Sequence, residues 1–315
     1  MARAAAREGD VIAPAALFVN PGARAGADAF EAAARALGAA GVPLVAAERV
    51  DDPAALPGRV AAAVEAGAAR VLVGGGDGTL SSAAGVLAGR DAALGVLPLG
   101  TGNDFARTLG IPHEVERAVE VFVRGVPRRV DLGRVDGHAF LNVASLGISS
   151  GLTKRLEDGL KKKVGRFAFL VSGAAEAANF QPFRARVVAD GAAAEYDALQ
   201  IVVGNGPFHG GGRLVAPGAS NRDGTLHLYV LAAGAPGPEL SPAERLRELT
   251  RVARYALLLG RGRHLTHPDV HVAAARAVRI ETDPPLELDV DGELRGRTPV
   301  DLRVEPGALR VIARG

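Results

Sequence analysis

Two glycine-rich loops hold the side chains with the clearest chemical potential in the chain. The first follows an apolar run, precedes a helical pattern, and consists of Gly74, Gly75, Gly76, Asp77, Gly78 and Thr79. Glycine lets the backbone approach a ligand closely, and the N–H groups that open a helix bind phosphate. Asp77 would repel phosphate unless a divalent cation lay between them, so the loop indicates a site for Mg²⁺ and a nucleotide. The alternative is a tight turn in which Asp77 or Thr79 caps the helix.

The second loop also lies between an apolar run and a helical pattern. It consists of Gly100, Thr101, Gly102, Asn103 and Asp104, which together offer a hydroxyl, an amide and a carboxylate. Asp104 could instead serve only as the cap of its own helix. Two such loops on neighbouring strands favour a phosphate site more strongly than either loop alone.

Composition and missing motifs exclude several other classes of protein. The chain has no G-x-x-x-x-G-K-[ST] motif, and neither glycine cluster reads G-x-G-x-x-G. The absence of cysteine excludes disulfides, thiolate zinc sites and a cysteine nucleophile. A net charge of +2 is too small to indicate nucleic-acid binding by itself. No apolar stretch reaches the roughly 20 residues that a membrane-spanning helix needs.

The loops must be held by an alternation of strands and helices over residues 1–126. The sequence predicts strands at 15–20, 43–50, 70–74 and 94–98, and helices at 28–38, 53–67, 79–88, 104–109 and 115–124. This alternation is typical of an α/β domain with a doubly wound, mainly parallel sheet. In such a domain ligands bind at the carboxyl ends of the strands, where both glycine loops lie.

Residues 127–305 show a different sequence pattern, in which Val- and Leu-rich runs are separated by Gly, Asp and Asn turns. Runs at 183–189, 199–204, 225–231 and 270–280 predict a β-rich domain, an antiparallel sandwich. Two helical insertions are expected, at 151–179 and 241–259. The last predicted strand, within 306–315, could belong to either domain.

These residues together resemble the catalytic family of diacylglycerol kinases, which includes bacterial lipid kinases and is related to sphingosine and ceramide kinases. The two glycine loops carry the resemblance first, and it continues through segments 142–147, 160–165, 204–212 and 216–224. It ends at Asp291, Gly292 and Glu293, and so covers nearly the whole chain in the expected order.

The resemblance implies a nucleotide domain, a second domain for the lipid, and the cofactors ATP and Mg²⁺. By resemblance the contacts with ATP come from Asn20, Pro21, Gly22, Ala23 and Arg24, from Gly74 to Thr79, and from Thr101. Ser220, Asp223 and Thr225 match a position where bacterial members hold Mg²⁺, and Asp77 is expected to hold part of the Mg²⁺ that accompanies ATP. Glu293 matches the general base, which would accept the proton of the lipid hydroxyl directly or through Asp291.

Some features leave alternatives open. The first loop of the family commonly reads Asn-Pro-x-Ser-Gly, whereas this chain has Ala23 and Arg24 at the last two places. An NAD kinase shares the Gly-Gly-Asp-Gly-Thr loop, and a catalytically silent nucleotide- or lipid-binding regulator is a third reading. Asp291–Glu293 and Asp223–Gly224 could each be plain turns.

The expected partner is a lipid substrate presented at a membrane surface, and no nucleic acid. We expect a cytoplasmic location, and the protein could also make peripheral contact with the inner face of the membrane. The basic cluster 161–166 beside Phe167 could make that contact or be a solvated face. A homodimer stays open, and the sequence does not say which lipid is phosphorylated.

Overall fold

The computed structural model describes residues 13–23, 26–148, 182–234 and 241–314. Its N-terminal part is a parallel sheet with strands in the order β4-β3-β1-β2. These strands are β1 (Ala15–Val19), β2 (Leu44–Arg49), β3 (Arg70–Gly75) and β4 (Ala93–Pro98). The helices are α1 (Gly26–Ala39), α2 (Leu56–Glu65) after the short turn η1 (Pro53–Ala55), α3 (Asp77–Leu87), α4 (Asp104–Leu109) and α5 (Val115–Arg124).

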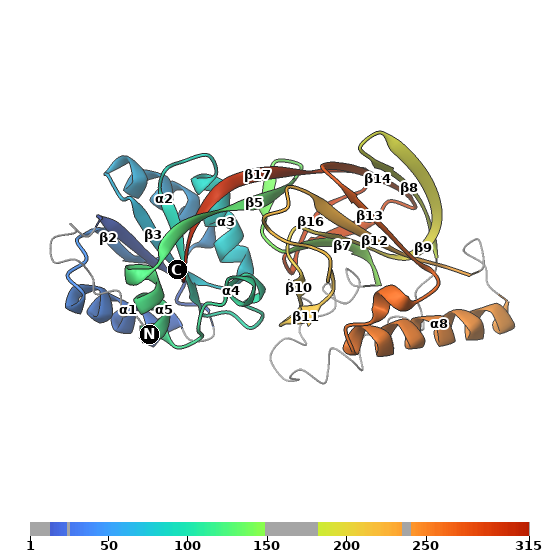
Figure 1. Cartoon of the computed structure of the whole chain (residues 1–315), viewed down its shortest axis with the longest axis horizontal. Helices are drawn as coiled ribbons and strands as arrows, with labels where there is room; N and C mark the ends of the chain where they lie inside the picture. The colour runs from blue at the N-terminus through green and yellow to red at the C-terminus, as the bar shows by residue number, and fades with distance from the viewer. Residues whose placement is uncertain (1–12, 24–25, 149–181, 235–240, 315) are drawn as a thin grey trace, which may run out of the picture.

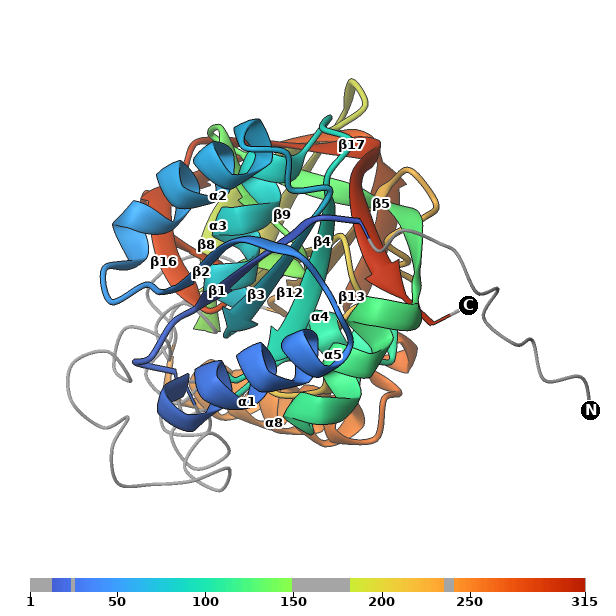
Figure 2. The same cartoon turned by 90° about the vertical axis from the view of Figure 1, so that its left-hand side faces the viewer.

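Helices cover both faces of this sheet. Helices α1 and α5 pack together on one face, and α2 and α3 pack together on the other (Figure 2). The central strands β1 and β3 are therefore buried on both sides, which explains why they are continuous apolar runs rather than alternating ones. The predicted doubly wound domain is confirmed.

The C-terminal part is built mainly from antiparallel strands, as predicted (Figure 1). The strands are β5 (Val126–Val135), β6 (His138–Phe140), β7 (Val143–Gly147), β8 (Phe183–Ala189), β9 (Ala192–Gly204), β10 (Phe208–His209), β11 (Arg213–Leu214), β12 (Leu226–Ala232), β13 (Val270–Ala275), β14 (Ala277–Asp283), β15 (Glu287–Val290), β16 (Glu293–Arg297) and β17 (Val300–Ala313). The described residues of this part also form helix α8 (Pro242–Gly260) and the 3-10 helix η3 (His264–Thr266). Its core is a cluster of aliphatic residues that includes Ile201, Val230 and Ile280.

One strand joins the two parts. Residues 300–303 of β17 pair with β14, residues 302–313 pair with β5, and Val311 pairs with Leu94 of β4 in parallel. Strand β17 thus connects the two parts in one continuous sheet, and it crosses between them along the upper edge of Figure 1.

The structure corrects one expected strand. The run 270–280 is two strands, because the backbone N–H groups of Arg276 and Ala277 turn to donate to the carboxylate of Asp190 at 3.0 and 2.9 Å. After this turn β13 pairs with β12, whereas β14 pairs with β8 and β17. A long-range side-chain contact of this kind leaves no local pattern in the sequence.

The structure bears on one of the two expectations about the membrane and not on the other. Within the described ranges, no helix has both the length and the apolar character that crossing a bilayer requires. The predicted helical insertion at 151–179, with its basic cluster 161–166, lies outside the described residues.

Candidate active site

The two glycine loops touch each other at the carboxyl edge of the parallel sheet. Gly74 and Gly75 end β3, Gly76 precedes α3, and Gly100 follows β4. A Cβ atom on Gly100 would lie only 2.5 Å from the Cα atom of Gly76, so position 100 needs glycine for this approach, whereas a Cβ on Gly76 would make an ordinary 3.5 Å contact. No side chain caps the start of α3, where Asp77, Gly78 and Thr79 form the first turn. Its N–H groups are therefore available to a ligand.

The second loop is closed by Asn103. The side-chain Oδ1 of Asn103 accepts from the N–H of Gly100, and its Nδ2 donates to the carbonyl of Gly100, both at 2.9 Å. Asn103 itself has a φ of 52°, a conformation that asparagine tolerates better than most residues. The amide expected to contact ATP is thus used inside the loop, whereas Thr101 is exposed.

Asp77 caps a helix, but not its own. Its carboxylate accepts from the N–H groups of Asp104 and Phe105, at 3.1 and 2.9 Å, and from Nδ2 of Asn142 at 3.2 Å. Asp77 therefore connects the first glycine loop to α4 of the second. Burial raises the pKa of Asp77, the nearby Asp104 carboxylate raises it further, and the backbone N–H donors oppose both effects.

Asp104 also acts on another segment. Its carboxylate accepts from the N–H groups of Gly211, at 3.1 Å, and Gly212, at 2.5 Å, in the turn between β10 and β11. The reading of Asp104 as only the cap of its own helix is therefore wrong, since these bonds hold α4 against the C-terminal part.

Asp291 lies in a two-residue hairpin turn between β15 and β16. Asp291 and Gly292 have φ values of 50° and 89°, as a tight hairpin requires. One carboxylate oxygen, Oδ2, accepts from Ser81 Oγ at 2.6 Å and from the N–H of Leu141 at 2.7 Å. The other, Oδ1, accepts from the N–H groups of Asn142 and Val143, both at 3.0 Å.

These four bonds give Asp291 a structural role. Both of its oxygens are occupied, which leaves little capacity for proton transfer. Burial raises the pKa of Asp291 to about 6, against the lowering effect of the hydrogen bonds. The turn that carries Glu293 is thus tied to α3 through Ser81.

Glu293 begins β16 and lies against the first glycine loop. A Cβ atom on Gly78 would lie 2.8 Å from Cδ of Glu293, so the carboxylate rests directly on the Gly78 backbone. The carboxylate also pairs with Arg295 at 2.7 Å, and about half of each side chain is exposed. A half-exposed carboxylate at the uncapped start of α3 is placed to accept a proton from a group near bound phosphate.

The predicted loop at the end of β1 reaches the same edge. The N–H of Asn20 donates to the carbonyl of Gly74 at 2.9 Å, and Oδ1 of Asn20 accepts from the N–H of Gly22 at 2.9 Å. Pro21, Gly22 and Ala23 form the turn that follows. Arg24, expected to assist ATP binding, lies outside the described residues.

The predicted metal position lies in the loop before β12. Asp223 Oδ1 accepts from the N–H and the hydroxyl of Thr225, both at 3.0 Å, and Asp223 Oδ2 lies 2.9 Å from Nε2 of His227. The N–H of Asp223 donates to the carbonyl of Ser220 at 3.4 Å. Across the described residues no group of three or more His, Asp or Glu side chains is placed to hold a metal ion. Binding of Mg²⁺ by Ser220, Asp223 and Thr225 stays a prediction.

Sequence reasoning gave no role to two residues of this network, Ser81 and Asn142. Asn142 donates to Asp77 through Nδ2 and to Asp291 through its N–H, so it touches both carboxylates. Ser81 meets Asp291 across 210 positions of the chain. No pattern in the neighbouring sequence indicates a role for either residue, because their partners are distant in the chain. Ser81 does lie one turn into the helix that follows the first glycine loop.

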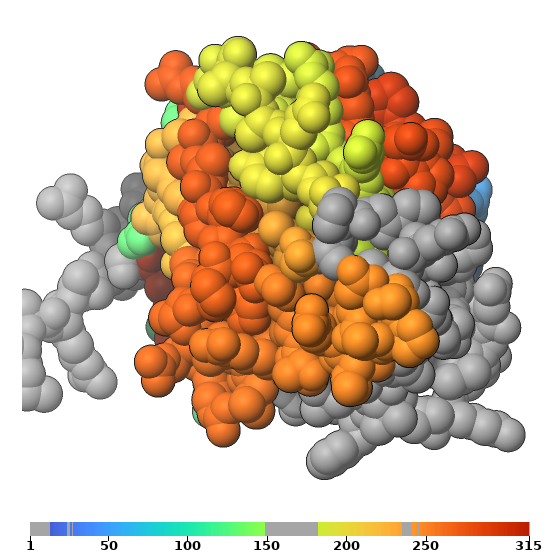
Figure 3. Space-filling model, turned by 90° about the vertical axis from the view of Figure 1, so that its right-hand side faces the viewer, coloured from blue at the N-terminus to red at the C-terminus, as the bar shows by residue number. Residues whose placement is uncertain are grey.

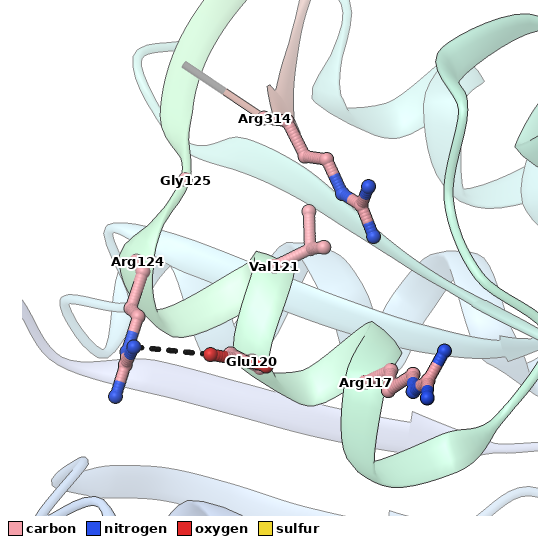
Figure 4. Close-up of a pocket in the computed structure, with 6 residues that line it drawn as sticks. All are labelled: Arg117, Glu120, Val121, Arg124, Gly125 and Arg314. Carbon is pink, nitrogen blue, oxygen red and sulfur yellow. Dashed lines mark ion pairs between the residues drawn. The ribbon is translucent and has the colours of Figure 1, made fainter. Parts of the chain in front are cut away.

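A concave surface elsewhere has none of the predicted site residues. It lies at the end of α5 and is lined by Arg117, Glu120, Val121, Arg124, Gly125 and Arg314 (Figure 4). Arg124 pairs there with Glu120 at 3.0 Å. This concave surface therefore does not locate the candidate active site, which is located instead by the hydrogen bonds and glycine contacts described above.

The site combines two glycine loops at the edge of a parallel sheet with the carboxylate of Glu293, which comes from the β-rich part. This combination is typical of proteins that transfer phosphate. Comparison with known proteins identifies the family. Residues 14–135 match the diacylglycerol kinase catalytic domain, and residues 142–313 match the YegS C-terminal NAD kinase beta sandwich-like domain. The chain therefore belongs to the diacylglycerol kinase and YegS-like lipid kinase family.

Individual relatives agree with this assignment. A protein of Pseudomonas aeruginosa named "Probable lipid kinase YegS-like" is 37% identical over 252 residues, which are 79% of this chain and 78% of the relative. The diacylglycerol kinase of Bacillus subtilis is 32% identical over 232 residues, which are 73% of this chain and 72% of the relative. A diacylglycerol kinase structure from Bacillus anthracis has the same fold, with a TM-score of 0.75 at 24% identity over 96% of this chain and 97% of that one.

Proposed function

We infer that the chain is an ATP-dependent lipid kinase that transfers the γ-phosphate to a lipid hydroxyl, in diacylglycerol or a related lipid. The observation that carries this inference is the position of Glu293, whose carboxylate rests on Gly78 where the two glycine loops meet. A base there is next to the phosphate-binding end of α3. Membership of a lipid kinase family supports the choice of acceptor.

The loops fit the phosphates of ATP. The N–H groups at the start of α3 have no side-chain cap, in contrast to those of α4, which Asp77 caps. An uncapped helix start of this kind attracts phosphate through its N–H groups and its dipole. The backbone of the Asn20 turn lies beside it, because Asn20 bonds to Gly74. The N–H groups of Asn20, Gly22 and Ala23 are already donated to Gly74 and Asn20, so the donors to phosphate come from the start of α3.

Asp77 and Asn142 fit a Mg²⁺ ion or its bound water. Oδ1 of Asp77 accepts two hydrogen bonds, but Oδ2 accepts only that of Asp104, which leaves a free lone pair. Oδ1 of Asn142 is buried and accepts no hydrogen bond from the described residues. A buried oxygen without a donor next to a carboxylate suits a hard cation. When bound, Mg²⁺ would neutralise the charge of the transferred phosphate.

Glu293 would take the proton of the lipid hydroxyl directly rather than through Asp291. Its carboxylate is half-exposed, whereas the oxygens of Asp291 already accept two hydrogen bonds each. Asp291 then acts as a positioning residue that fixes the turn before Glu293. Arg295 orients the Glu293 carboxylate from the same strand.

Phosphate transfer to extracted membrane lipids, measured with labelled ATP and Mg²⁺, tests the function. Labelled lipid is the expected product, and a parallel reaction with NAD as acceptor should give none. Product only with NAD would establish an NAD kinase, and product with neither would favour a silent binding protein.

The substitution Glu293→Gln tests the base. It should abolish turnover while ATP binding stays intact, because the amide cannot accept the proton. The matched control is Glu281→Gln, which breaks a similar pair with Arg279, two residues away on the outward face of β14. Near-normal turnover in Glu293→Gln would remove Glu293 from the base role.

A further inference from the structure

Helix α8 has two acidic side chains, of which Glu248 is buried against the protein and Glu244 caps the helix. Ser241 and Glu244 form a capping box at its start, and Glu248 accepts from the N–H of Gly234 at 2.8 Å. Arg251 pairs with Glu248 at 3.6 Å and also with Asp269. The inner face is anchored by Val252, which packs into a cluster with Leu199 and Leu231.

The outer face of α8 carries a row of exposed apolar residues. Leu246 and Leu257 are 66% and 56% exposed, and Ala253 between them is also exposed. At 100° per residue these three side chains lie within about 40° of one another around the helix axis. Leu265, 36% exposed, lies in η3 just beyond the helix end.

A row of arginines runs beside the leucines. Arg247, Arg254 and Arg261 are spaced by seven residues, are all exposed, and lie within about 40° of one another on the adjoining strip of the helix. None of the three has an ion pair or a side-chain hydrogen bond with any residue that the structure describes. Figure 3 shows the helix in orange at the surface of the C-terminal part.

We propose that this outer face of α8 docks on an anionic lipid bilayer. An apolar row beside unpaired positive charge is the arrangement of a helix that lies in the membrane interface, with its leucines among the acyl chains and its arginines at the head groups. A second copy of the chain fits less well. A two-fold contact would place the same positive face against itself, without acidic groups to neutralise it.

The helix is also close to the candidate active site. The C-terminal end of α8 contacts β11, and a Cβ on Gly262 would lie 3.7 Å from Leu214 of that strand. The turn before β11 is the one that binds Asp104 through Gly211 and Gly212. The C-terminal end of a docked α8 would therefore lie beside the segment that is bonded to α4. This step rests on the proposed function, since it gives the enzyme access to a lipid.

Co-sedimentation of the full chain with vesicles tests the proposal. The probes are vesicles of phosphatidylcholine alone and of phosphatidylcholine mixed with phosphatidylglycerol. The chain should bind the anionic vesicles and bind them less as salt is raised. The variant Arg247→Glu with Arg254→Glu should bind at least about tenfold more weakly, and Leu246→Gln with Leu257→Gln several-fold more weakly.

The matched control reverses two exposed arginines elsewhere, Arg35→Glu with Arg90→Glu. It changes the net charge equally and should bind the anionic vesicles as the original chain does. Equal loss in this control, or full binding by both α8 variants, would overturn the proposal. A shift from dimer to monomer in the leucine variant, with vesicle binding unchanged, would show that the face joins two copies instead.

The vesicles contain no substrate lipid and the assay needs no ATP, so the result is independent of the kinase reaction. If the chain binds vesicles but phosphorylates nothing, the proposed function fails and the docking surface stands. If it phosphorylates lipid in detergent micelles but ignores anionic vesicles, the docking surface fails alone.

Discussion

Replacing Gly78 with alanine should separate catalysis from stability. The new Cβ would lie 2.8 Å from Cδ of Glu293 and nearer still to Oε1, whereas ordinary contacts begin near 3.4 Å. Glu293 must yield, because its carboxylate is the free end of a half-exposed side chain, whereas α3 is anchored by the buried Leu80 and Ala84. The carboxylate should move by about 1 Å, which at a reacting group costs on the order of 100-fold in rate, or about 2.7 kcal/mol.

The same substitution should leave the fold intact or strengthen it. Alanine is favoured over glycine in a helix by up to about 1 kcal/mol. Urea unfolding should therefore show equal or greater stability, while lipid phosphorylation falls. Gly58→Ala in α2 is the control, since nothing lies within 4 Å of its added Cβ, and it should keep full activity. Turnover of Gly78→Ala within about threefold of the original would refute the placement of Glu293 as the base.

Three further outcomes follow from the buried groups. Ser81→Ala removes the 2.6 Å bond to Asp291 and should lower the free energy of unfolding by about 1–2 kcal/mol in urea titrations; no change would mean that the bond contributes nothing. Asp77→Asn should remove most lipid phosphorylation and lower the melting temperature, because the amide NH2 cannot accept the N–H bond that one carboxylate oxygen now accepts at the start of α4; an unchanged melting temperature would contradict this account. Burial lowers the pKa of His264 below its ordinary 6.5, so its contribution to stability is complete above pH 6.5 and is lost as the pH falls. The urea midpoint of the His264→Gln variant should fall less between pH 7.5 and pH 5.5 than that of the original chain, and an equal fall would exclude His264 as its source. Asp291 has the opposite effect: because its folded-state pKa is raised to about 6, it adds to stability as the pH falls below about 6.

The sequence predicted the parts of the site that are local. Each glycine loop is a short segment between a strand and a helix, so its position at the carboxyl edge of the sheet follows from the alternation of elements. The fold class follows from the same alternation and from the change to β-rich texture after Val126. For these features the period of apolar residues and the glycine positions were sufficient.

The connections between the loops could not be predicted in the same way. Asp77 and Asp104 look like caps of the helices they open, yet each binds backbone N–H groups of a different segment. Asp291 is bound by three consecutive N–H groups, 141–143, far away in the chain. Such partners are chosen by tertiary packing, because any buried carboxylate must find donors and the sequence does not say which ones.

Strand β17 has a consequence for how the protein is made. Strand β4 is synthesised long before β17, the strand that covers its free edge through Val311. Until then β4 keeps an open row of backbone donors and acceptors, which is a template for pairing with other chains. The nascent nucleotide domain should therefore depend on chaperones, and loss of residues 308–313 should yield aggregates rather than a smaller active enzyme.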